Sequence, residues 1–281
     1  MKYLRFLPLS LLLFVAGCDV IAPPFEDNPT APVDTNTTAV KRMVLVEEFT
    51  GIKCPNCPDA SHFAHSLLES AAYKDNMILV AVHAGNLAKP NGSIYTADYR
   101  TDVGAELWTT FLLDHVPVAS VNRILDAGAH WLEKGLWEGK IAEEIAKPVE
   151  VKIDIATTYN EANRSLSVSV DNEFLVEGST NENLLVYLIE DGIVSPQDSL
   201  GEEVTNYKHR NMLRATLNTV WGENLSTSAI ATGTKITKNY TYVIPATVNN
   251  IAINVDNCSI VAFVHNNDTK VVRQAAIKKI K

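Results

Sequence analysis

The sequence lacks the features of a nucleic-acid-binding or membrane-spanning protein. It has 33 acidic against 24 basic residues and no basic cluster, which argues against binding to nucleic acid or to anionic lipid surfaces. No apolar run approaches the roughly 20 residues that a transmembrane helix needs. A covalently attached lipid is therefore the means of membrane attachment that we expect from this sequence.

Cysteine is also scarce, with four residues in a chain of 281. So few cysteines in so long a chain are not a disulfide framework that holds a small fold together. Cys54 and Cys57 are only three residues apart, and such a close pair in a chain with so few cysteines indicates a chemical role for the two thiols. Cys258 stands alone and is most simply a buried apolar residue.

The first 17 residues have the three parts of a secretory signal. Basic residues precede an apolar run at 6–16, and small residues precede Cys18. The sequence Val-Ala-Gly-Cys at 15–18 resembles a bacterial lipobox, in which the cysteine becomes the lipidated first residue of the mature protein. We expect 1–17 to be a lipoprotein signal peptide and Cys18 to carry lipid. Residues 18–40, rich in Pro, Thr, Asn and Asp, are expected to be a disordered tether.

The next segment, 41–148, combines strand and helix patterns. Fully apolar runs predict buried strands, and apolar residues at a spacing of three to four predict helices between them. The first strand, helix and strand form a βαβ unit, which implies a parallel pair. Pro148 marks a domain boundary. The expected strands are 43–49, 77–83 and 116–122, and the expected helices are 58–73, 105–113 and 132–146.

After Pro148 the pattern changes to alternation of apolar and polar residues, typical of strands with one buried face. Turn-forming residues separate the runs, so we expect an all-β, sandwich-like domain at 149–281. The segment 206–221 has no strand pattern and is expected to be a helix or an ordered loop. The expected strands are 149–155, 166–170, 184–189, 240–244, 259–264 and 270–276.

The motif Cys54-Pro55-Asn56-Cys57 follows a predicted strand and opens a predicted helix. Unpaired amides and the helix dipole at such a terminus stabilise a thiolate and lower its pKa. Lys53 adds a positive charge beside the sulfur, and Pro55 suits the first helical position. This geometry makes Cys54 the expected exposed attacking thiol and Cys57 the buried resolving thiol.

The same cysteine spacing also serves inert disulfides and zinc sites. His62 and His65 follow the pair, but on a helix they lie more than a turn beyond the sulfurs, and a zinc site needs permanently reduced cysteines. A redox-active pair is our preferred interpretation, with an inert disulfide on a binding scaffold and a metal site as alternatives. Four other polar residues are interpreted as structural rather than as site residues: His83, His115, His209 and Arg214.

The sequence Phe-Thr-Gly-Ile-Lys-Cys-Pro-Asn-Cys at 49–57 resembles the active site of the thioredoxin superfamily. The resemblance assigns Pro117 to the place of that family's cis-proline, which implies a cis Val116–Pro117 bond against the dithiol. It assigns Glu48 to the place of the buried acid behind the second cysteine. Burial there would raise the pKa of Glu48 and let it relay a proton to or from Cys57.

Two departures from the thioredoxin pattern affect the redox potential. Thr50 and Lys53 replace the tryptophans that usually flank the motif, and Pro55-Asn56 replaces Gly-Pro between the cysteines. The direction of electron flow therefore stays open.

Taken whole, the chain resembles the thioredoxin-like outer-membrane lipoprotein family of Bacteroides-type bacteria. The shared features are Val46–Gly51, Tyr207–Arg214 and Val261–Val264. The resemblance implies a lipid-anchored location at the cell outer membrane, and it fits a thioredoxin-like α/β domain followed by an all-β, sandwich-like domain. It brings no established reaction.

We therefore expect an envelope lipoprotein that exchanges thiols and disulfides with exported proteins. It would need no cofactor and no metal, and it would contact the membrane through its lipid. The alternative is a non-enzymatic binding lipoprotein that uses the thioredoxin fold as a scaffold. The expected site residues are Cys54, Cys57, Glu48 and Pro117.

Overall fold

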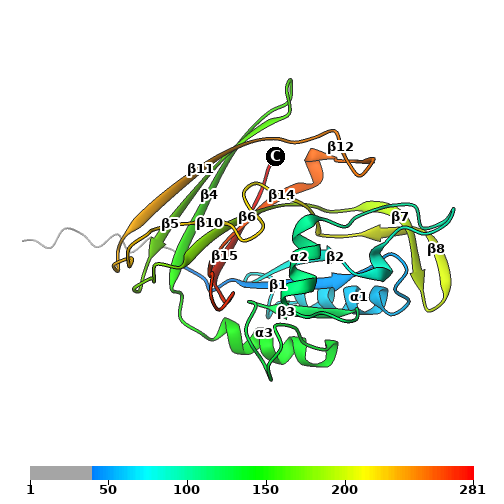
Figure 1. Ribbon diagram of the computed structural model, residues 1–281, viewed down its shortest axis with the longest axis horizontal. Coiled ribbons are helices and arrows are strands. Elements are labelled where there is room, and N and C mark those ends of the chain that lie inside the picture. The colour runs from blue at the N-terminus through cyan, green and yellow to red at the C-terminus, as the bar shows by residue number, and fades with distance from the viewer. Residues whose placement is uncertain (1–39) are drawn as a thin grey trace, which may run out of the picture. The chain divides into compact units, whose positions relative to one another are not determined.

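The computed structural model describes residues 40–281, so the expected signal peptide, the lipidation site Cys18 and nearly all of the tether lie outside the described residues. Its largest element is an eight-stranded mixed sheet with the order β15-β14-β6-β9-β2-β1-β3, to which β10 adds by pairing with β6 (Figure 1). The strands of this sheet are β1 (Val44–Thr50), β2 (Met77–His83), β3 (Val118–Val121), β6 (Glu182–Glu190), β9 (Met212–Thr216), β10 (Glu223–Asn224), β14 (Cys258–Asn266) and β15 (Val272–Lys279).

The segment expected to be α/β is mixed α/β in the structure. Strands β1 and β2 are parallel and joined through a helix, which confirms the predicted βαβ unit, and β3 pairs antiparallel with β1. Side chains of α1 and α3 pack on one face of these strands, and those of α2 pack on the other. The helices are α1 (Cys57–Glu69), α2 (Asp102–Thr110) and α3 (Trp137–Ile145), with short 3-10 turns η1 (Asn86–Ala88), η2 (Lys134–Leu136) and η3 (Val255–Asn257).

Local chemistry explains where the helices begin and end. The Thr101 side chain accepts a hydrogen bond from the Gly104 amide, and this cap starts α2 at Asp102, earlier than the sequence pattern predicts. Helix α1 ends at Glu69 rather than at residue 73, because Ser70 adopts an extended backbone.

The segment after Pro148 is rich in antiparallel strands arranged in two layers. A three-stranded sheet, in the order β11-β5-β4, packs over one face of β6 and β14, and the layers share an apolar core (Figure 1). The segment is therefore rich in β-sheet, as expected, and a separate all-β, sandwich-like domain stays a prediction. The other face of β6 and β14 packs against the core that contains α2. The strands of the second layer are β4 (Val151–Asn160), β5 (Ser165–Phe174) and β11 (Lys235–Val243).

Two short hairpins stand outside both sheets. One is β7 (Ile193–Ser199) with β8 (Glu202–His209), and the other is β12 (Thr247–Val248) with β13 (Ile251–Ala252). Neither hairpin has a strong alternating apolar pattern, and the sequence analysis did not predict them.

Strand β9 corrects one prediction. The segment 206–221, expected to be a helix or a loop, contains the end of β8 and all of β9. Strand β9 lies between β2 and β6, and the Ala81 amide donates to the Asn211 carbonyl at 2.8 Å. The main sheet therefore runs without a break from strands before Pro148 to strands after it. The division into domains at 148 stays a prediction.

Candidate functional site

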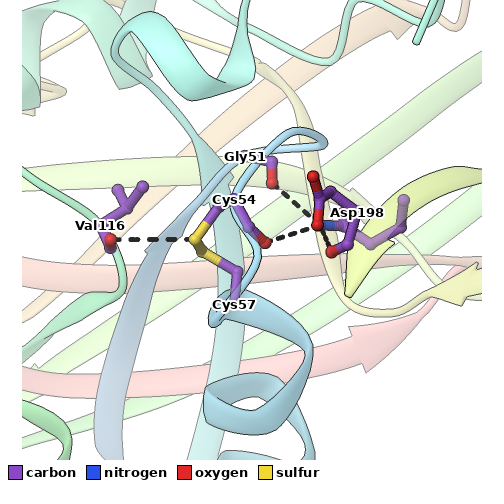
Figure 2. The surroundings of a disulfide bond; sticks show 6 residues. Gly51, Cys54, Cys57, Val116 and Asp198 are labelled. Atoms are coloured by element: carbon purple, nitrogen blue, oxygen red, sulfur yellow. Dashed lines mark hydrogen bonds between the residues drawn. A yellow bond between two sulfur atoms is a disulfide. The ribbon is translucent and has the colours of Figure 1, made fainter. Parts of the chain in front are cut away.

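The loop between β1 and α1 carries a disulfide between Cys54 and Cys57, with the sulfurs 2.08 Å apart (Figure 2). The Cys54 amide donates to the Gly51 carbonyl at 3.0 Å, which turns the chain tightly after the strand. A Cβ on Gly51 would lie 2.5 Å from the carbonyl carbon of Leu87, so this position accepts only glycine. The loop is held between β1 and the turn at η1.

The structure corrects two details of this loop. Helix α1 begins at Cys57, so Pro55 precedes the helix, and Pro58 is the proline in its first turn. The two cysteines are also buried alike, with 1% of Cys54 and 2% of Cys57 exposed. The expectation that Cys54 is exposed is therefore wrong for the disulfide form, because neighbouring loops cover both sulfurs.

The proline loop lies where the sequence places it. The Val116–Pro117 bond is cis, which confirms that prediction. The carbonyl oxygen of Val116 lies 3.8 Å from the Cys54 sulfur (Figure 2). Pro117 directly precedes β3, which pairs with β1, so the sheet itself brings this loop against the disulfide.

Glu48 is buried on β1, with 1% of the residue exposed and no hydrogen-bond partner for either carboxylate oxygen among residues 40–281. Burial raises the pKa of Glu48 to about 8, and the nearby Ser61 hydroxyl partly opposes this shift. The raised pKa agrees with the prediction for a buried acid. Glu47 points to the opposite face, as strand alternation requires, and binds Arg123.

The hairpin β7–β8 supplies site residues that the sequence analysis missed. The buried side-chain amide of Gln197 donates to the carbonyl oxygens of Gly51 and Cys54, at 3.1 and 3.2 Å. The backbone amides of Asp198 and Leu200 donate to the carbonyl oxygens of Ile52 and Pro55, each at 2.9 Å, and hold the same loop. A hairpin some 140 residues later in the sequence therefore fixes the disulfide loop. The shared segment Tyr207–Arg214 was the nearest signal in the sequence.

Replacing Gln197 with leucine should lower the free energy of unfolding by about 1–2 kcal/mol, because two carbonyl oxygens lose a buried donor while each keeps one backbone partner. Urea denaturation followed by circular dichroism measures this change. The matched control is Asn206→Ala, an exposed residue on the neighbouring strand, which should change stability by less than about 0.5 kcal/mol. Equal stability of the two variants would contradict the role of Gln197.

The histidines interpreted as structural lie in different surroundings. His115 is partly exposed between Asp114 and Glu133, and these carboxylates raise its pKa. Burial lowers the pKa of His65 to about 4, while its neighbour His62 is exposed. Within residues 40–281 no three His, Cys, Asp or Glu side chains come together as a metal site would require.

His83, His209, Arg214 and Cys258 are all buried. Arg214 forms an ion pair with Glu190, in agreement with a structural role. Cys258 is 1% exposed, and burial raises the pKa of its thiol to about 12, which confirms that it is a buried residue. His83 and His209 lie close together beside the disulfide, with ring centroids 5.6 Å apart.

Two solved structures from Porphyromonas gingivalis are similar to this chain. HBP35 matches 86% of this chain and 76% of its own with a TM-score of 0.67 at 16% identity, which is a likeness of fold. A domain of the outer membrane lipoprotein Omp28 matches 48% of this chain and 91% of its own, with a TM-score of 0.33 at 23% identity. No curated protein sequence matches the chain.

No helix among residues 40–281 is both long and apolar enough to span a bilayer. The family model of outer membrane protein Omp28 matches residues 106–281, which is more than half of the chain. The chain therefore belongs to the Omp28 family, and its location is the cell outer membrane, as the sequence predicts.

Proposed function

We propose that this protein is a thiol–disulfide exchange module at the outer membrane, held there by lipid on Cys18, and that residues 41–148 are a thioredoxin-like domain. The observation that carries the proposal is the meeting of three features at one loop. These are the Cys54–Cys57 disulfide, the cis Val116–Pro117 bond in contact with it, and the buried acid Glu48 on β1, the strand that leads into this loop.

In this proposal a thiolate of an exported protein attacks the sulfur of Cys54. A mixed disulfide forms with Cys54, the Cys54–Cys57 bond breaks, and Cys57 leaves as a thiolate. A second thiolate of the exported protein then attacks the mixed disulfide, so Cys54 leaves reduced. The exported protein supplies two electrons and ends as a disulfide, and the reverse sequence would reduce a disulfide substrate.

The carboxyl group of Glu48 is in the protonation state that this exchange needs. With a pKa of about 8 its carboxyl holds a proton at neutral pH and can give it to the departing Cys57 thiolate. When Cys57 attacks in the reverse direction, the ionised carboxylate can take the proton back.

The test uses single cysteine variants of the full chain. Cys57→Ser should trap mixed disulfides on Cys54, because no thiol remains to resolve them, and mass spectrometry of the trapped species identifies the partners. Cys54→Ser, with the resolving thiol alone, is the matched control and should trap far fewer. Equal and low trapping by both variants would reject thiol–disulfide exchange.

A second candidate is a binding lipoprotein in which the disulfide only holds the loop. Burial of both sulfurs favours it, because only 1% of Cys54 is exposed to an attacking thiol. For this candidate, replacing both cysteines leaves ligand binding unchanged, and the wild-type disulfide does not equilibrate with glutathione.

A further inference from the structure

A small polar cavity of about 10 Å³ lies beside Cys57. Its wall includes the hydroxyl of Ser61 from α1 and the imidazole of His83 from the end of β2. Strand β8 contributes Tyr207 and His209. A cavity of this size is just large enough for one water molecule, provided that two to four polar groups line it. The hairpin β7–β8 therefore closes a polar space of water size next to one sulfur of the disulfide.

One wall group has a nitrogen atom without a partner. His83 is 4% exposed, and its Nδ1 has no hydrogen-bond partner among residues 40–281. Leaving a buried polar group unpaired is unfavourable, and such groups usually bind an ordered water when space allows. The cavity wall thus includes a buried residue with a polar atom that no group in the described part of the chain satisfies.

The groups around the cavity are neutral at pH 7, with one exception. Burial lowers the pKa of His209 to about 4 and the pKa of His83 well below its usual value, and it raises the pKa of the Tyr207 phenol. Neutral imidazole and phenol groups both donate and accept hydrogen bonds. Arg210 is the charged residue in the wall, and its guanidinium is paired with Glu69 at 2.7 Å.

The cavity is linked to solvent. Ser61 and Tyr207 in its wall are only partly buried, whereas Cys57 is buried. The cavity therefore joins the buried Cys57 to polar side chains that reach the surface.

We infer that strand β8 completes the redox site: Tyr207 and His209 close a cavity that binds one water beside Cys57, and this water carries protons between Cys57 and solvent. The inference rests on the proposed function and extends it, because it makes the hairpin after Pro148 a part of the reacting site. Tyr207 and His209 act on Cys57 through the water and are positioning residues.

The proton balance of the exchange is complete with this path. When a partner thiolate bonds to Cys54, the Cys54–Cys57 bond breaks and Cys57 keeps the electron pair. The Cys57 thiolate then takes a proton from the cavity water, and solvent returns a proton to that water through the partly exposed side of the cavity at Ser61 and Tyr207.

The test measures the titration of Cys57 without any partner protein. In full-length Cys54→Ser, the pH profile of iodoacetamide alkylation at Cys57, followed by peptide mass, has a midpoint that reports the thiol pKa and a plateau that reports access. Adding Tyr207→Phe should raise the midpoint by about half to one pH unit and slow alkylation at pH 8 by about threefold to tenfold, because the water that donates to the thiolate loses one of the polar groups that hold it. Asn206→Ala, an exposed neighbour on β8, should leave the midpoint unchanged.

Charged and titratable side chains lie in the cavity wall or near Cys57 in the sequence: Glu48, Lys53, Asp59, His83, Tyr207, His209 and Arg210. All of them except Tyr207 itself are present in both Tyr207→Phe and Asn206→Ala, so the comparison of these two variants isolates the effect of the Tyr207 phenol.

An unchanged midpoint in Tyr207→Phe would overturn the inference, and so would a crystal structure that resolves waters elsewhere and shows none in the cavity. An ordered water there together with the shifted midpoint supports it. Failure of the proposed function is seen separately, as equal and low trapping of partners by Cys57→Ser and Cys54→Ser while the Cys57 midpoint still responds to Tyr207→Phe.

Discussion

Replacing Glu47 with glutamine should lower the free energy of unfolding by about 3–5 kcal/mol. The Glu47 carboxylate accepts two hydrogen bonds from Arg123, each 2.7 Å, and one from the Tyr187 hydroxyl at 3.1 Å. Both charged side chains are buried, with 1% of Glu47 and 0% of Arg123 exposed. Removing the negative charge leaves the guanidinium in the core without its counter-charge, which is the costly half of a buried ion pair.

Chemical denaturation at pH 7 measures this loss, and the double variant Glu47→Gln with Arg123→Met is the matched comparison. Removing both charges should restore much of the stability, because no uncompensated charge remains. The Arg123 guanidinium lies 4.9 Å from the ring centroid of Phe263, so methionine meets an apolar surface there. A single variant that loses less than about 1 kcal/mol would show that the pair contributes little.

The second large effect concerns the pH dependence of stability at Glu48. Its pKa is about 8 in the folded protein and near 4.5 when unfolded, so the folded state holds a proton that the unfolded state has lost between these values. Stability is therefore full below about pH 4.5 and falls as the pH rises toward 8, by roughly 5 kcal/mol in total for such a shift. Glu48→Gln removes this titration and should abolish that fall.

Urea unfolding of wild type and Glu48→Gln at pH 5 and at pH 9 gives the required difference. The buried histidines titrate in both proteins and cancel when the two are subtracted. We expect the glutamine variant to gain on the wild type by several kcal/mol between these pH values. Parallel pH profiles would mean that Glu48 is ionised at neutral pH, and its role as a proton donor to Cys57 would then fail.

Local patterns in the sequence predicted the elements whose residues carry their own signal. The apolar runs that became β1 and β2 need no distant partner to be recognised, because a strand buried on both faces is apolar at every position. Alternation along a strand also predicted that Glu47 and Glu48 point to opposite faces. The cysteine pair was recognised from its spacing in the sequence. The roles expected for Pro117 and Glu48 came from the thioredoxin resemblance.

The sequence alone did not reveal the contacts that complete the site. Gln197 lies 143 residues after Cys54, and the hairpin that carries it has an irregular register and partly exposed strands, so no periodicity marks it. Strand β9 was not predicted for a related reason. It has only five residues, which is too short for a clear periodic pattern, and its place in the sheet between β2 and β6 depends on distant segments.

The sequence by itself thus determined the strands and helices that have a strong local pattern, the close cysteine pair and the opposite faces of the two glutamates. Tertiary structure alone decided that both sulfurs are buried, that Arg123 and Tyr187 meet Glu47, and that Tyr207 and His209 lie beside Cys57. The physical reason is that the burial of a side chain and the pairing of polar groups depend on segments that are distant in sequence and come together only when the whole chain folds. Local residue spacing specifies which side chains share one face of a strand or helix. It does not specify which distant segment of the chain packs on that face.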